Sequence, residues 1–193
     1  INAVHKDSRR VRLRVALAFP DTYEIGMSHL GIQMLYHILN QREDLYCERA
    51  FAPWVDMEAA MRQHGILLGS QETRTPLRDF DVVGFSLQYE LSYTNVLTML
   101  ELGGIPLLSA YRQKSHPLVI AGGPCATNPE PMVDFLDAVV IGDGEEVILE
   151  LVDHVLAWKK QGSDRTSLLK RLAGIAGVYV PSMYEVGYDH LGR

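Results

Sequence analysis

Short apolar runs alternate along this chain with stretches of helical periodicity, and this alternation limits the fold more than any other feature. The apolar runs typical of strands cover residues 11–19, 46–51, 81–87, 118–121 and 138–141. Apolar residues at helical spacing occupy the stretches 27–38, 57–65, 93–100, 145–162 and 167–172. Strands joined by helices favour parallel pairing through right-handed crossovers. We therefore expect an α/β fold with a doubly wound, mainly parallel sheet of the Rossmann-like or flavodoxin-like kind.

The last part of the chain breaks this alternation. Residues 178–186 are typical of a strand, and turn-forming residues follow at 187–192, so we expect a hairpin that lacks its return strand. A weaker apolar run at 66–69 predicts one further short strand. We accordingly divide the chain into an α/β domain at 1–176 and a C-terminal strand with a truncated hairpin at 177–193. The half hairpin and the missing initial Met indicate a piece of a longer protein.

Composition excludes several classes of protein. The chain has 193 residues, 47% of them apolar, which suits a globular domain rather than a disordered one. Its net charge of −6 argues against nucleic acid as a partner. Two cysteines cannot form a disulfide framework, and no apolar run approaches the ~18 residues of a membrane span. With no signal peptide at the start, we expect a cytoplasmic protein without a membrane partner.

Four loops at the carboxyl ends of the expected strands are the candidate ligand-binding segments, because open parallel sheets bind ligands at that edge. They are rich in glycine, aromatic residues and hydrogen-bonding groups. The candidate binding residues are Asp21, Thr22, Tyr23, Gly26, Ser86, Leu87, Gln88, Tyr89, Gly122, Gly123, Pro124, Gly142, Asp143, Gly144 and Glu145. A parallel fold needs glycines at such turns even when it binds no ligand. Each loop alone is therefore consistent both with a ligand-binding role and with a purely structural one.

The common occupants of such sheets do not match the chemistry of these loops. A dinucleotide site needs G-x-G-x-x-G after the first strand, whereas the nearest match, Gly142-x-Gly144-x-x-Val147, comes late and carries carboxylates. A P-loop lysine, a flavin-phosphate loop and a receiver-type acidic cluster are all missing from the sequence. The run 84–88 lacks the second glycine of a nucleophile elbow.

Neither the histidines nor the cysteines indicate a catalytic or metal site. The seven histidines have no metal-ligand spacing; His29 and His37 are two helical turns apart and are interpreted as helix-surface residues. Cys125 is either a reactive or metal-binding thiol or, more often for this residue type, a small buried side chain. We therefore assign no catalytic residue and no metal ligand.

Taken together, the loops resemble those of the cobalamin-binding (B12-binding) domain. That family carries D-x-H-x-x-G after the first strand, S-x-L after a middle strand and a glycine pair after a later one. The matching positions here are Asp21-x-Tyr23-x-x-Gly26, Ser86 with Leu87, and Gly122-Gly123. The runs FPDTYEIGMSHLG, DVVGFSLQYELSYTNVL, IAGGPCATNPEP and VIGDGEE are similar to the N-terminal domain of B12-binding radical SAM proteins, in particular an uncharacterised YgiQ-like bacterial subfamily, over residues 2–188.

This chain departs from the family pattern in two ways. Tyr23 stands where the family's histidine would ligate cobalt, and a phenol with a pKa near ~10 replaces imidazole poorly. The resemblance therefore implies base-off cobalamin without a lower histidine ligand. The CxxxCxxC run of radical SAM enzymes is missing as well. S-adenosylmethionine and the [4Fe-4S] cluster would thus belong to a radical SAM domain elsewhere in the parent protein, where cobalamin carries a methyl group or assists another radical step, and this fragment alone is not an enzyme.

Two interpretations follow from the resemblance. In the first, the corrin ring rests on Tyr23, Gln88 and Tyr89, while small residues keep a slot open for the nucleotide tail: Gly26, Ser86, Gly122 and Gly123. Asp143 and Glu145 then accept hydrogen bonds from corrin amides, or instead stabilise the start of the following helix. In the second, the domain binds no cofactor and serves as a structural or substrate-recognition part of the same enzyme. Open space beside Gly26 and Ser86 favours the first, and a filled slot favours the second.

Overall fold

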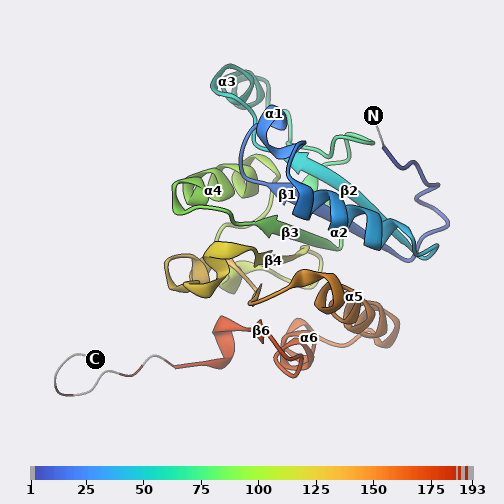
Figure 1. Cartoon of the computed structure of the whole chain (residues 1–193), viewed down its shortest axis with the longest axis vertical. Coiled ribbons are helices and arrows are strands. Elements are labelled where there is room, and N and C mark those ends of the chain that lie inside the picture. Colours follow the sequence, from blue (N-terminus) through green and yellow to red (C-terminus); the bar gives the residue numbers. More distant parts are fainter. Residues whose placement is uncertain (1–2, 186, 188–189, 191–193) are drawn as a thin grey trace.

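The computed structural model, which describes residues 3–185 together with 187 and 190, has one mixed sheet at its centre (Figure 1). Its strands are β1 (Leu13–Phe19), β2 (Leu45–Phe51), β3 (Val82–Ser86), β4 (Leu118–Gly122), β5 (Ala138–Val140) and β6 (Val178–Tyr179). Their order across the sheet is β2-β1-β3-β4-β5-β6, with the first five parallel and β6 antiparallel to β5. The order 2-1-3-4-5 is the flavodoxin-like arrangement. In it, successive strands are added on one side of β1 and then on the other, so the strand order reverses between β1 and β3.

Helices cover both faces of this sheet (Figure 1). They are α1 (Tyr23–Gly26), α2 (Leu30–Asn40), α3 (Val55–His64), α4 (Tyr93–Leu102), α5 (Gly144–Gln161) and α6 (Arg165–Leu172). The side chains of α2, α5 and α6 pack with Val15 and Leu17 on one face, whereas those of α3 and α4 pack with Ala16 and Ala18 on the other. This division follows from the alternation of side chains along a strand. No helix among the described residues is long and apolar enough to span a membrane.

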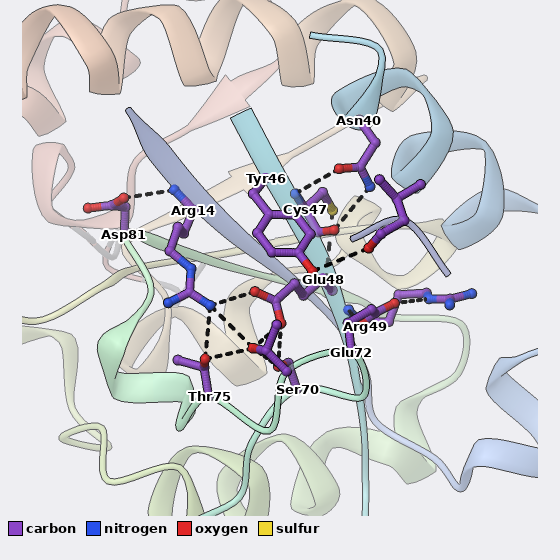
Figure 2. Close-up of polar contacts among 12 residues, drawn as sticks. Arg14, Asn40, Tyr46, Cys47, Glu48, Arg49, Ser70, Glu72, Thr75 and Asp81 are labelled. Carbon is purple, nitrogen blue, oxygen red and sulfur yellow. Dashed lines mark hydrogen bonds and ion pairs between the residues drawn. The ribbon is translucent and has the colours of Figure 1, made fainter. Parts of the chain in front are cut away.

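A buried polar network closes the outer edge of β2 (Figure 2). The fully buried carboxylate of Glu48 accepts hydrogen bonds from Arg14 Nη2 at 2.5 Å and from Ser70 Oγ at 2.6 Å. Next along the strand, the backbone N–H and the Nε of Arg49 both donate to Glu72, each at 2.8 Å. Residues 70–75 therefore hydrogen-bond to groups of β2 that would otherwise be exposed at the edge of the sheet.

Apart from two strands, the strands and helices expected from the sequence are confirmed, with boundaries that shift by a few residues. The structure corrects two of the predicted strands. Residues 66–69 form no strand of the sheet, because the segment turns back on itself and makes a single bridge between Gly69 and Pro76. Of the strand expected at 178–186, only Val178 and Tyr179 form a strand (β6), because a 3-10 turn begins at Pro181.

The turn expected at 187–192 lies for the most part outside the described residues. The division of the chain at residue 176 stays a prediction. Within the described part, β6 pairs with β5, and Val178 and Val180 lie in the same core as α5.

Candidate functional site

A cavity of about 420 Å³ lies between the sheet and helices α2 and α5. It opens at the carboxyl ends of β3, β4 and β5 and extends down the sheet face that those helices cover, where β1 contributes Val15 and Leu17. This is the point where the strand order reverses, the usual ligand position in open α/β sheets. Its volume falls within the ~300–1,000 Å³ typical of small-molecule sites.

The interior of this cavity is apolar. Its walls are formed by sheet residues and by the inner sides of the two helices: Val15, Leu17, Ile120, Val140, Ile32, Leu35 and Ile148. All of these except Leu35 are buried and form part of the main core. The cavity is therefore a slot that reaches into the core rather than a depression in the surface.

Two glycines on the strands leave this slot open. A Cβ atom built at Gly84 would meet Ile120 at 3.4 Å and Leu17 at 3.6 Å, which are ordinary contact distances. A Cβ atom at Gly122 would come no closer than 3.7 Å to Val140. Packing alone therefore does not demand glycine at either position, and the missing side chains add free space to the slot.

Polar groups gather at the mouth of the slot. Gln88 Nε2 donates a hydrogen bond to Ser86 Oγ at 2.8 Å, which leaves the hydroxyl proton of Ser86 free for another acceptor. Gly123 lies directly beside this pair with φ of 104°, and a Cβ atom there would come within 2.7 Å of the Leu87 carbonyl oxygen. Only glycine fits such a position, because a side chain there would clash with the protein's own backbone.

The loop from β5 to α5 supplies the other side of the mouth. Gly142 has φ of 112°, and the N-cap residue Asp143 makes no capping hydrogen bond through its side chain. Gly144 and Glu145 begin α5 and also line the cavity. The Asp143 and Glu145 carboxylates can therefore accept hydrogen bonds from a ligand while they stabilise the helix N-terminus.

His29 lies at the start of α2 and lines the cavity. Its Nδ1 accepts a hydrogen bond from the Ile32 backbone N–H at 3.3 Å, so the imidazole acts as the N-cap of the helix. A ring nitrogen that accepts in this way carries no proton, and the proton of the neutral ring is then on Nε2. In this arrangement His29 offers a ligand a hydrogen-bond donor and no free lone pair.

The structure brings only part of the predicted site together. Nine predicted residues line the cavity: Ser86, Gln88, Gly122, Gly123, Pro124, Gly142, Asp143, Gly144 and Glu145. Six do not: Asp21, Thr22, Tyr23, Gly26, Leu87 and Tyr89. The loops after β3, β4 and β5 therefore surround the slot, whereas the loop after β1 lies beside it.

Packing explains why the β1 loop stays outside the cavity. A Cβ atom at Gly26 would come within 2.5 Å of the Phe51 ring, so the space expected beside Gly26 is filled by that side chain. Tyr23, 43% exposed, packs edge-on against the same ring at 5.4 Å. Asp21 accepts a hydrogen bond from the Tyr89 hydroxyl, a contact that raises the pKa of Tyr89.

Sequence reasoning missed Gly84, His29 and the helix residues that face the slot. Gly84 carried a usable signal, because a glycine inside a buried apolar strand often marks close approach by a ligand or another backbone. His29 comes shortly after the first strand, where a ligand-facing residue is expected. Ile32 and Leu35 have no such signal, since a core-facing helix stripe has the same apolar spacing whether or not a cavity lies beneath it.

The charge around the cavity limits the ligand chemistry. Among the described residues that line it there is no lysine or arginine, whereas Asp143 and Glu145 stand at the mouth. Groups with several phosphates are usually held by cationic side chains, so a nucleotide diphosphate fits poorly here. A largely uncharged ligand with amide groups fits the acceptors at the mouth better.

The described residues contain no cluster of three His, Cys, Asp or Glu side chains that could hold a metal ion. Neither cysteine is activated as a nucleophile. Burial raises the pKa of the Cys125 thiol and raises that of Cys47 well above its ordinary value. A thiol with a raised pKa carries little of the reactive thiolate at neutral pH.

The two thiols should therefore react slowly with an aromatic disulfide reagent at pH 7. In the native protein we expect only Cys125 to be modified, because it is partly exposed and Cys47 is fully buried. The absorbance of the released thiolate measures the reaction, and unfolding in guanidinium should expose the second thiol. Fast labelling of Cys125, at or above the rate of free cysteine, would contradict this assignment.

Comparison with known proteins gives three matches. Residues 31–181 match the family model described as the N-terminal part of radical SAM proteins. An uncharacterized protein of Methanocaldococcus jannaschii is 23% identical over 143 residues, which cover 72% of this chain and 26% of that protein. Among solved structures, the radical S-adenosylmethionine methyltransferase TsrM from Kitasatospora setae, determined with tryptophan substrate and a SAM analog bound, is similar with a TM-score of 0.54 at 17% identity.

The match to TsrM covers 86% of this chain and 28% of the TsrM chain. At this level of identity the similarity shows a shared fold. This chain thus spans about a quarter of the length of both proteins.

Proposed function

Because this chain belongs to the family formed by the N-terminal region of radical SAM proteins, we propose that it is the cobalamin-binding domain of a radical SAM enzyme. The observation that carries the proposal is the open apolar slot between the sheet and helices α2 and α5. The slot would take the nucleotide tail, and the corrin would lie over the loops at its mouth. When bound, cobalamin supplies a cobalt that carries a methyl group or assists a radical step.

The residues at the mouth suit this ligand. Ser86 has a hydroxyl proton to donate, because its oxygen already accepts from Gln88. Asp143 and Glu145 are acceptors for the primary amides that fringe a corrin ring. The missing side chain at Gly122 leaves space beside Val140 for the ligand. Together these groups would hold and orient the cofactor, while the reacting radical would come from the parent protein's radical SAM domain.

The cofactor is proposed to bind base-off and without a histidine ligand to cobalt. Tyr23 replaces the family's histidine and packs on Phe51 beside the cavity. His29 is the one imidazole among the described residues that line the slot, and its Nδ1 is engaged as a helix cap. Binding cobalt through Nε2 would require the proton to move to Nδ1, which would break the capping hydrogen bond.

A second candidate is a domain of the same enzyme that binds no cofactor and recognises substrate or supports the fold. The observation in its favour is the β1 loop, where Phe51 fills the space beside Gly26 and the expected ligand position holds Tyr23. The two candidates differ in one measurable property, the binding of cobalamin.

Titration of the purified protein with hydroxocobalamin tests the proposal. We expect saturable binding and the visible spectrum of base-off cobalamin. After reduction to Co(II), the electron paramagnetic resonance spectrum should lack the splitting that an imidazole nitrogen ligand produces. His29→Asn, which keeps a capping side chain without imidazole, should give the same spectra.

A flat titration at high micromolar cobalamin would favour the cofactor-free candidate. Nitrogen splitting that disappears in His29→Asn would instead identify His29 as a cobalt ligand and overturn the base-off proposal without overturning cobalamin binding.

A further inference from the structure

The distribution of polar groups in the slot has a consequence for which cofactor it accepts. All polar side chains that line the cavity in the described part of the chain are on loops at the mouth, at a helix start or at the end of a strand: His29, Ser86, Gln88, Thr127, Asp143 and Glu145. Gly84 precedes Ser86 by two residues and thus lies on the same sheet face, about 7 Å deeper. Leu17 and Ile120 line the cavity at that depth, and Val15 lines it two residues deeper.

The backbone does not supply polar partners at that depth either. The strands that form the floor are β1, β3 and β4, and they pair with one another through Leu17, Gly84 and Ile120. Their N–H and C=O groups are therefore consumed in the parallel ladders of the sheet. A ligand group that enters this part of the slot leaves water and gains only van der Waals contacts.

On the basis of the proposed cobalamin site, we propose that the slot selects cobamides whose lower base is a benzimidazole over those whose lower base is a purine. The two kinds of base share an imidazole ring and differ in the six-membered ring fused to it. In dimethylbenzimidazole that ring is a hydrocarbon with two methyl groups. In adenine it holds two ring nitrogens and an exocyclic amino group, each of which needs a hydrogen-bond partner.

The cost of burying the adenine ring sets the expected size of the effect. A buried polar group without a partner loses its hydration and receives nothing in return. A hydrophobic pocket also gains contacts from the two methyl groups of dimethylbenzimidazole, and a single methylene difference already gives about 10-fold discrimination or more. We therefore expect the adenine cobamide to bind about 10- to 100-fold more weakly than cobalamin.

Three corrinoids separate this inference from the proposal on which it rests. The purified protein is titrated with cobalamin, with adeninylcobamide and with cobinamide, which has the corrin ring but no base. The inference expects cobalamin to bind most tightly. Equal or tighter binding of adeninylcobamide overturns the base preference but leaves the cobalamin site intact. Equal binding of cobalamin and cobinamide shows that the slot does not hold the base, which overturns the inference while the corrin site stands.

If none of the three corrinoids binds, the proposed function fails and the base preference fails with it. That outcome cannot be confused with loss of the preference alone, in which at least two of the corrinoids bind.

Two buried valines provide a matched control. Val15 lines the deep part of the slot, whereas Val139 on β5 faces the core on the other side of the sheet. Val15→Thr places a hydroxyl among the apolar side chains of the slot and should reduce the preference for cobalamin over adeninylcobamide several-fold. Val139→Thr should leave the preference unchanged. Cobinamide binding by both variants verifies that they are folded, and an unchanged preference in Val15→Thr would contradict the assignment of this wall to the base.

Discussion

Replacing Gly84 with leucine should weaken cobalamin binding by about 100-fold or more. The Cβ of the new side chain is accommodated at ordinary distances from Ile120 and Leu17, and its remaining carbons project into the cavity of about 420 Å³. A side chain there occupies the volume that the proposed function assigns to the nucleotide tail, so cofactor and leucine would exclude each other. The change is measured by the same visible titration with hydroxocobalamin.

Two variants control for effects on the fold. Gly84→Ala adds one methyl group at the same position and should weaken binding much less than leucine does. Gly187→Leu makes the same substitution where a Cβ atom meets nothing within 4 Å, outside the cavity, and should leave binding unchanged. Thermal unfolding of each variant verifies that the chain is folded. Normal cobalamin binding by a well-folded Gly84→Leu protein would exclude the slot as the position of the tail.

Replacing Asp137 with asparagine should lower the free energy of unfolding by about 3–5 kcal/mol, because it leaves a buried guanidinium without its counter-ion. Asp137 is 3% exposed, and its Oδ2 accepts from Arg112 Nη1 at 3.0 Å, Arg165 Nη2 at 2.8 Å and Val119 N at 2.7 Å. The Arg112 side chain is buried as well. Burial lowers the pKa of Arg112, and the charge of Asp137 opposes that shift.

Urea unfolding followed by circular dichroism measures this loss. The matched control is Asp134→Asn, which makes the same change at an exposed residue three positions earlier and should alter stability by no more than about 0.5 kcal/mol. Equal stability of the two variants would show that the Arg112 charge finds other partners. Asp137 immediately precedes β5, whose Val140 lines the slot, so a large loss should also weaken cofactor binding.

The layout of the sheet could be predicted from the sequence because two signals agree. Apolar runs such as 81–87 and 118–121 mark strands that are buried on both faces, and the helical stretches between them require parallel crossovers. Glycine-rich loops after β4 and β5 then had to meet at one edge, where the cavity is found. The position of those loop residues follows from topology alone and needs no knowledge of side-chain packing.

The parts that could not be predicted depend on tertiary packing. Gly26 matches a motif position, but whether a glycine leaves space or makes room for a neighbour depends on Phe51, which comes from the next strand. Residues 66–69 are suitable for a strand, yet Gly69 pairs with Pro76 in an isolated bridge and the segment does not join the sheet. The sequence predicts a helix-surface position for His29, but as the N-cap of α2 it lines the cavity.

The slot shares Val15, Leu17, Ile32 and Ile148 with the main core, so filling it is thermodynamically linked to folding. A ligand bound only by the native state adds RT ln(1 + [L]/Kd) to stability, about 2.7 kcal/mol at a hundred times its dissociation constant. The ligand-free protein is correspondingly more susceptible to proteolysis. The amount of this protein in a cell would then depend on the supply of the ligand that fills the slot.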